Sequence, residues 1–303
     1  MAINFTFSTR ATDRGLEHYA QVQGNAAPRF LIGKQTNYLG NTGLFNISIN
    51  TALQYRAADY AAQHGFWAHF IAPTAKCESE GSFFCLNTYD RAQFTFGFMQ
   101  YAAHVAGGDF VIFLQKLLQL PDASDYFPRL RLENGLIHYQ NTNGVLGLLE
   151  STDPQTDNQK LMDYLNPHLD EVENQELICA ARMVHWATNS AAHRKIQVDT
   201  AIELFKKDMN RYAHEYNLNG MPDKICLIIC DIRHQGRARS SAIINALNTN
   251  SNLDRAYNRL FNLGETHYSG RIRTLRTAVA QLVANGTLGI KKYSSATNDF
   301  VPI

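Results

Sequence analysis

Residues 77–100 read CESEGSFFCLNTYDRAQFTFGFMQ. The aromatic alternation at Phe94, Phe96 and Phe98 predicts a β-hairpin over residues 83–98, and the apolar spacing before it predicts a helix that runs towards Glu78. Two acids, Glu78 and Glu80, then lie at the helix end, and Asp90 lies on the hairpin with Thr95 five residues further along. Residues two apart on a helix point about 200° apart, so only one glutamate can face a given cleft.

This combination of side chains suits glycoside hydrolysis. One carboxylic acid must protonate the leaving oxygen, and a second carboxylate must stabilise the oxocarbenium-like centre or activate water. The Phe residues of the stretch supply an apolar surround, and the Thr95 hydroxyl is placed to orient a water. The same pattern also fits a purely structural role, in which the glutamates are a solvated helix end and Asp90 is a turn residue.

Outward from this stretch the apolar periodicity is mostly helical. Gly65 is expected to end one helix, and Pro73 is expected in the first turn of the short helix that runs towards Glu78. The remaining spacing predicts helices over about 52–64, 109–119, 157–165, 171–188, 193–216, 223–234, 238–249, 252–262 and 270–284.

A second hairpin is expected over residues 129–139, because Asn134-Gly135 is a strong turn signal between apolar residues. Residues 1–26 carry little apolar weight and are expected to form an extended N-terminal arm. The fold class is therefore α+β and mainly α. We expect one catalytic domain over 27–303, with a β-hairpin region at about 83–140 and a helical lobe at about 157–285.

The stretch from about 75 to 101 resembles the lysozyme-like superfamily, in which a helix ends at the catalytic Glu and a hairpin follows. The hairpin pattern of Asp, four residues, Thr, one residue and Gly is met here by Asp90, Thr95 and Gly97. The match is similar to phage-type lysozymes and chitosanases, and Glu-Ser followed by Gly-Phe-Met-Gln resembles two boxes of lytic transglycosylases. The run 87–104 is similar to lysozyme-like domains of bacterial secretion effectors.

The resemblance implies a two-lobed lysozyme-like domain that needs no cofactor. It implies that Glu78 is the general acid, Asp90 the base or electrostatic stabiliser, and Thr95 the water-positioning hydroxyl. Glu80 competes with Glu78 for the acid role. Further candidates for substrate binding are Tyr89, Arg91, Gln100, Tyr101, Arg233 and His234.

The last two of these candidates follow an apolar helix. Arg233 and His234 either meet the substrate groove or cap that helix by contacting its last carbonyls. Cys226, Cys230 and His234 share one helical stripe, where core packing of the thiols is favoured over a metal site, so no metal is expected. Cys77 and Cys85 either form a disulfide beside the proposed acid or stay reduced.

The charge of the chain limits the classes of partner that we expect it to bind. The chain has 28 Lys and Arg against 27 Asp and Glu, a formal net charge of +1, so no overall field favours nucleic acid. No run of about 18 apolar residues predicts a membrane span. Between Asp231 and Arg276 there are eight arginines against three acids. This local excess repels polycationic chitosan and favours peptidoglycan, although a plain basic surface is also consistent with it.

We therefore expect a peptidoglycan glycan-strand hydrolase (muramidase). The alternatives are a chitosanase, a lytic transglycosylase, or a carbohydrate-binding or adaptor module without activity. No Sec signal is visible at the N-terminus. The expected setting is a protein made in the cytoplasm that acts in the periplasm or cell wall, as a secreted antibacterial effector or an endolysin. Its partners would be an amino-sugar polymer, and an immunity protein or a component of a secretion machine.

Overall fold

The computed structural model describes residues 2–13, 15–46 and 53–303. It is a mixed α+β structure with 46% helix and 21% strand. The chain forms two compact units, which we call the sheet unit (Met1–Gln54 and Ser82–Thr200) and the helical unit (Tyr55–Gly81 and Ala201–Ile303). The decisive stretch 77–100 is thus divided between the units after Gly81.

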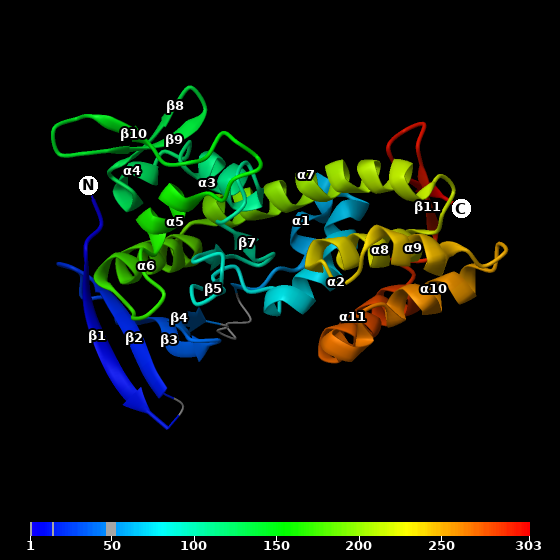
Figure 1. The fold of residues 1–303 in the computed structure, drawn as a ribbon, viewed down its shortest axis with the longest axis horizontal. Coiled ribbons are helices and arrows are strands. Elements are labelled where there is room, and N and C mark those ends of the chain that lie inside the picture. The colour runs from blue at the N-terminus through cyan, green and yellow to red at the C-terminus, as the bar shows by residue number, and fades with distance from the viewer. Residues whose placement is uncertain (1, 14, 47–52) are drawn as a thin grey trace. The chain divides into compact units, whose positions relative to one another are not determined.

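Within the sheet unit, the largest sheet of the described residues is an antiparallel meander, whose first four strands are blue in Figure 1. Its strands follow one another in chain order: β1 (Phe5–Thr12), β2 (Gly15–Val22), β3 (Phe30–Tyr38), β4 (Asn41–Asn46), β5 (Leu86–Asn87), β6 (Thr95–Phe96) and β7 (Tyr101–Ala102). The predicted 83–98 hairpin is confirmed as the short pair β5–β6.

The N-terminal segment shows where the structure adds to the sequence interpretation. Residues 1–26, expected as an extended arm, contain strands β1 and β2, which pair with each other, and β2 also pairs with β3. Phe5 is buried and meets Phe30 edge to face at 5.9 Å between ring centroids. Strand pairing and the buried Phe5 therefore place this segment in the sheet. Strands β3 and β4 were not predicted, because polar residues 34–37 mask the alternation.

The remaining elements of the sheet unit lie after the meander. The predicted 129–139 hairpin is confirmed, and Asn134 and Gly135 both have positive φ at its turn. Helix α6 carries Trp186, which is fully buried and stacks on Tyr126 at 4.8 Å. These elements are α3 (Asp109–Leu117), α4 (Ala123–Tyr126), β8 (Leu130–Glu133), β9 (Leu136–Gln140), β10 (Leu146–Leu148), α5 (Gln159–Leu165), α6 (Asn174–Asn189) and the start of α7 (Ala191–Tyr216).

A buried carboxyl links α6 to the sheet. The Glu176 side chain accepts hydrogen bonds from the Leu44 N–H at 3.2 Å and from the Thr88 hydroxyl. Its Oε2 atom is buried and has no hydrogen-bond partner among the described residues. Burial raises the pKa of Glu176 to about 7, although the hydrogen bonds oppose this rise.

This shift predicts a pH-dependent stability. A raised folded-state pKa means that the folded protein binds the proton more tightly, so the stabilisation is complete below about pH 4.5 and is lost as pH rises through about 7. The loss amounts to about 3 kcal/mol. We expect urea unfolding between pH 5 and 8 to show this loss in the parent protein and to lack it in Glu176→Gln. The exposed-site variant Glu171→Gln is the control, and equal pH slopes for all three proteins would contradict the prediction.

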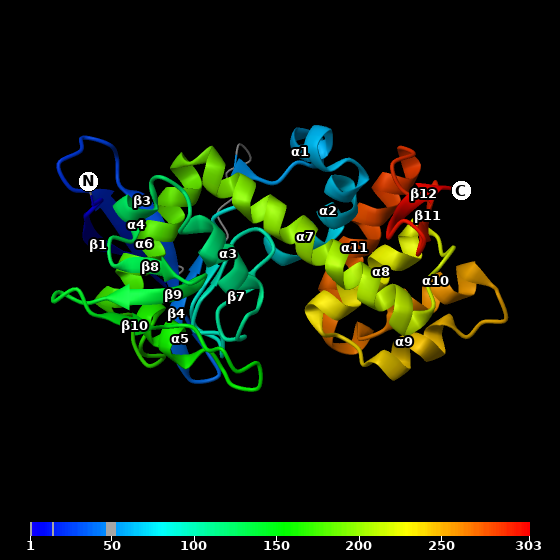
Figure 2. The same ribbon diagram turned by 90° about the horizontal axis from the view of Figure 1, so that it is seen from above.

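The helical unit is built around a buried helix. Helix α8 is apolar on nearly all sides, with Ile225, Ile228 and Ile232 fully buried. The C-terminal hairpin, drawn red in Figure 2, lies beside the start of α8, where Pro222 and Lys292 form a β-bridge. The unit contains α1 (Ala57–His64), α2 (Phe66–Ser79), the rest of α7, α8 (Asp223–Gln235), α9 (Ser240–Leu247), α10 (Leu253–Asn262), α11 (Glu265–Ala284), β11 (Lys291–Ser294) and β12 (Asp299–Pro302).

The predicted helices are confirmed to within a few residues at their ends, and one position needs correction. Gly65 ends α1 as expected, with φ 57°. Pro73, however, lies inside α2 and not in its first turn. The helix begins earlier because Trp67 and Phe70 pack into the core around Phe300, which offsets the missing Pro73 hydrogen bond. None of the described helices is both long and apolar enough to cross a membrane.

Candidate active site

The end of α2 sets the two glutamates apart. The Glu80 N–H bonds to the Lys76 carbonyl at 3.2 Å, which is the bond of a left-handed C-cap, and the Gly81 N–H bonds to the Ala75 carbonyl at 3.1 Å. Glu80 has left-handed φ of 55° and lies outside the helix. Glu78 remains in the last helical turn. The helical angle assumed from sequence therefore does not apply to this pair.

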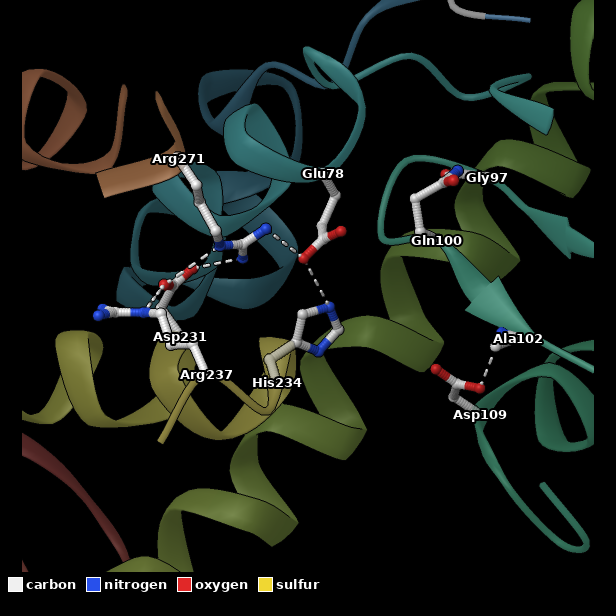
Figure 3. A network of polar contacts seen from close by, with 9 residues as sticks. All are labelled: Glu78, Gly97, Gln100, Ala102, Asp109, Asp231, His234, Arg237 and Arg271. Carbon is white, nitrogen blue, oxygen red and sulfur yellow. Dashed lines mark hydrogen bonds and ion pairs between the residues drawn. The ribbon is translucent and has the colours of Figure 1, made fainter. Parts of the chain in front are cut away.

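Glu78 points into a polar cluster of the helical unit, drawn in Figure 3. Its Oε1 lies 2.7 Å from Nη1 of Arg271 and 3.4 Å from Nε2 of His234. Only 13% of the Glu78 side chain is exposed. Helices α2, α8 and α11 each supply one of these residues, so tertiary packing creates the cluster.

The cluster contains a second carboxylate, that of Asp231, which offsets the positive charge of its arginines. Asp231 is fully buried and accepts a hydrogen bond from Nη2 of Arg271 at 2.7 Å, while its Oδ2 lies 3.5 Å from Nε of Arg237. Burial opposes the charge of Arg271, yet Asp231 and Glu78 outweigh this effect and raise its pKa. Burial lowers the pKa of Arg237. Arg271 thus forms ion pairs with two carboxylates, those of Glu78 and Asp231.

Glu80 lies outside this cluster. Its carboxylate pairs with Lys76 at 2.5 Å across one helical turn, and both side chains are about half exposed. A pair of this kind on the surface contributes at most about 1 kcal/mol. The environments of the two glutamates therefore differ, and Glu78 has the enclosed one.

Asp90 belongs to the sheet unit, in the loop between β5 and β6. Its Oδ2 accepts from Nδ2 of Asn87 and its Oδ1 from the Ala92 N–H, both at 2.9 Å. The carboxylate is half-buried, and the two bonds fix its orientation. Thr95 follows in β6 and is only 6% exposed.

The structure explains why position 97 of the predicted motif is a glycine. Its φ is 90°, and a Cβ there would lie 2.5 Å from Oε1 of Gln197. This Gln197 carboxamide, from α7, accepts from the Phe98 N–H at 3.1 Å and donates to the Phe83 carbonyl at 2.7 Å. It therefore fastens both ends of the stretch that carries Asp90, which the sequence alone did not reveal.

Gly97→Ala is expected to destabilise the protein more than Gly135→Ala. Both glycines have positive φ, but an added Cβ at Gly135 meets no atom within 4 Å. The difference between the variants therefore reports the collision with Gln197, about 1 to 3 kcal/mol for overpacking. Urea unfolding measures it. Equal losses of unfolding free energy in the two variants would show that Gln197 moves away from the added Cβ without destabilising the protein.

The remaining substrate-binding candidates of the sheet unit divide by exposure. Tyr101 is buried, and its hydroxyl donates to the Gln197 carbonyl at 2.5 Å, so its prediction as a substrate contact is wrong. Gln100 bonds to the Gly97 carbonyl at 2.9 Å (Figure 3). Tyr89 packs beside the Phe45 ring. Arg91 is the most exposed and pairs with Asp157 at 3.0 Å.

The other two candidates, Arg233 and His234, are neighbours on α8 but contact different residues. His234 joins Glu78, as described above, whereas Arg233 donates to Oγ of Ser240 at 3.2 Å and lies over the Tyr212 ring. Sequence reasoning placed Asp231 at a helix end and missed its role with Arg271. One signal was available, because Asp231 is a lone acid at the end of an otherwise apolar run.

Of the cysteines, Cys77 lies beside the polar cluster, where its thiol donates to the Arg271 carbonyl at 3.7 Å. Cys77 is a free thiol, so it does not form the disulfide with Cys85 that the sequence allowed, and burial raises its pKa to about 12. Cys226 and Cys230 are buried. Among residues 2–13, 15–46 and 53–303, no group of three or more His, Cys, Asp or Glu is arranged to hold a metal ion.

Comparison with known proteins adds no relative. No protein-family model, no curated protein and no solved structure matches this chain. The lysozyme-like resemblance therefore depends on the residues quoted from the sequence. The geometry around Glu78 and Asp90 is the further ground for a functional proposal.

Proposed function

We propose that this chain is a lysozyme-like glycoside hydrolase that cleaves the β-1,4 glycan of peptidoglycan, with Glu78 as general acid. The observation that carries the proposal is the enclosed Glu78 carboxyl in the last turn of α2, held by Arg271 and His234. A general acid must be positioned firmly and must regain its proton after each turnover. Arg271 and His234 supply the positioning, because both contact Oε1 of Glu78.

Asp90 is proposed as the base or electrostatic stabiliser, with Thr95 as the water-positioning hydroxyl. The hydrogen bonds from Asn87 and from the Ala92 N–H support this role, because they orient the Asp90 carboxylate. A reaction in which Asp90 activates water inverts the anomeric configuration. Glu80 is assigned no catalytic role, since it pairs with Lys76 outside the polar cluster.

The choice of peptidoglycan depends on the exposed arginines of the helical unit. Arg237 is buried and bound to Asp231, so it adds nothing to a polymer-binding surface. Four other arginines of the 231–276 segment remain exposed, and they support binding of an anionic polymer over polycationic chitosan: Arg239, Arg255, Arg273 and Arg276. The proposed setting is a target cell wall reached through a secretion machine or by lysis, and the proposed partners are an immunity protein or a component of the secretion machine.

The ion pairs of Glu78 favour a second candidate, a glycan-binding module without hydrolytic activity. A carboxylate shared between Arg271 and His234 is also what a structural role requires. Binding and catalysis differ in their products, so the two candidates are separable.

Digestion of purified cell walls followed by mass spectrometry tests the proposal. We expect loss of turbidity and soluble muropeptides with reducing ends. Anhydro ends would assign a lytic transglycosylase, and binding without release would assign the glycan-binding module. Rapid hydrolysis of chitosan, with the cell walls left intact, would assign chitosan as the substrate in place of peptidoglycan. Proton NMR of the first product formed distinguishes inversion from retention.

A further inference from the structure

A pocket of about 720 Å³ lies within the helical unit, between α2 and α11. Four small residues are among those that line it, namely Ala72, Ala75, Gly81 and Ala278, and we refer to these four as its floor. Small side chains at the contact of two packed helices leave space that larger ones would fill. The volume is that of a typical site for a small molecule. We call it the α2–α11 pocket.

One wall of this pocket carries hydroxyl and amide groups at helical spacing. Thr274, Thr277 and Gln281 recur along one face of α11, and they line the pocket together with Asn285, which directly follows the helix. Thr277 donates its hydroxyl proton to the Arg273 carbonyl at 3.0 Å, which leaves its oxygen free to accept from a ligand. Such a wall offers hydrogen bonds to hydroxyl and amide groups of a ligand.

The charges of the lining select for an anion. Lys76 and Glu80 line the pocket and neutralise each other at 2.5 Å. Arg273 also lines it and is exposed, and no carboxylate in the described part of the chain pairs with it. The lining therefore keeps one uncompensated positive charge. A guanidinium in this setting binds a carboxylate through two parallel hydrogen bonds.

The geometry points to a binding site for a small sugar acid in the α2–α11 pocket. Arg273 binds the carboxylate, the α11 wall binds hydroxyl and N-acetyl groups, and the small-residue floor contacts the apolar face of the sugar ring. N-acetylmuramic acid has this chemistry. Its choice as ligand is based on the proposed function, because peptidoglycan is the source of that sugar. Glu78 does not line the pocket, so this site is separate from the proposed acid.

Isothermal titration of the full chain with N-acetylmuramic acid tests the site. We expect saturable binding, and no comparable binding of N-acetylglucosamine, which lacks the carboxylate. Arg273→Gln is expected to weaken binding at least about tenfold through loss of a charge-assisted hydrogen bond. Ala278→Leu, which fills the floor, is expected to weaken it similarly. Lys207→Gln removes the same charge at an exposed position on α7 of the helical unit, outside the pocket, and should bind like the parent.

Three results would overturn the site: absence of saturable binding by the parent protein, equal binding of both sugars, or equal weakening by Lys207→Gln and Arg273→Gln. Glu78→Gln keeps the pocket and should bind N-acetylmuramic acid with parental affinity. Binding without wall digestion by the parent would reject the proposed hydrolase and keep the site. Wall digestion without this binding would reject the site and keep the hydrolase.

Discussion

Glu78→Gln is expected to lower the rate of cell-wall digestion by about 10² to 10⁴-fold. The amide keeps the shape of the side chain and accepts a hydrogen bond from Arg271, but it cannot donate the proton that the leaving oxygen needs. Initial rates of turbidity loss, measured at equal concentrations of folded protein, give the size of the effect.

Glu80→Gln is the matched control for this measurement. It removes the same charge two residues away, from a pair with Lys76 that is about half exposed. We expect nearly parental rates from it. If Glu80→Gln is inactive while Glu78→Gln digests walls normally, the assignment of the acid is wrong. If both are active, the proposed catalytic chemistry itself fails.

Asp231→Asn is expected to cost about 3 to 5 kcal/mol of the free energy of unfolding. Asp231 is fully buried and is paired with Arg237 and Arg271, whose side chains are 0% and 9% exposed. Removing its charge leaves Arg237 without a carboxylate partner and leaves Arg271 with Glu78 alone. Urea unfolding at neutral pH measures the loss.

The control is Asp254→Asn, because Asp254 also pairs with a cation, Lys224, but is 88% exposed. Solvent screens such a pair, and we expect a loss below about 1 kcal/mol. Similar losses in the two variants would mean that the buried cluster contributes little more than a surface ion pair. A large loss in Asp231→Asn alone would show that the buried cluster contributes more to stability than the surface ion pair of Asp254 and Lys224.

Local patterns explain which elements were predictable from the sequence. The helices and the 129–139 hairpin follow from periodicity and from Asn134-Gly135, since these signals depend on neighbouring residues. Strands β3 and β4 were missed because their stability comes from pairing along the sheet and from the buried side chains of Ile32 and Leu44. Pro73 was misplaced for the same reason, since core packing of Trp67 and Phe70 extends α2 on its N-terminal side.

The candidate site was predictable only in its residue types. Glu78, Asp90 and Thr95 stand within one short stretch, so the spacing of the motif was enough to select them. The different surroundings of Glu78 and Glu80 were not predictable, because the left-handed C-cap places Glu80 outside the helix. Tyr101 was wrongly included because an aromatic ring in a motif gives no indication of its burial.

The sequence by itself determined the α+β class, most helices, the turns at Gly65 and Asn134-Gly135, and the acids available for chemistry. The tertiary structure decided the partners. Arg271 meets Asp231 across 40 residues of chain, and Gln197 meets Phe98 across 99. Such contacts depend on how whole helices pack, and the identity of a residue does not encode which distant side chain will neutralise it.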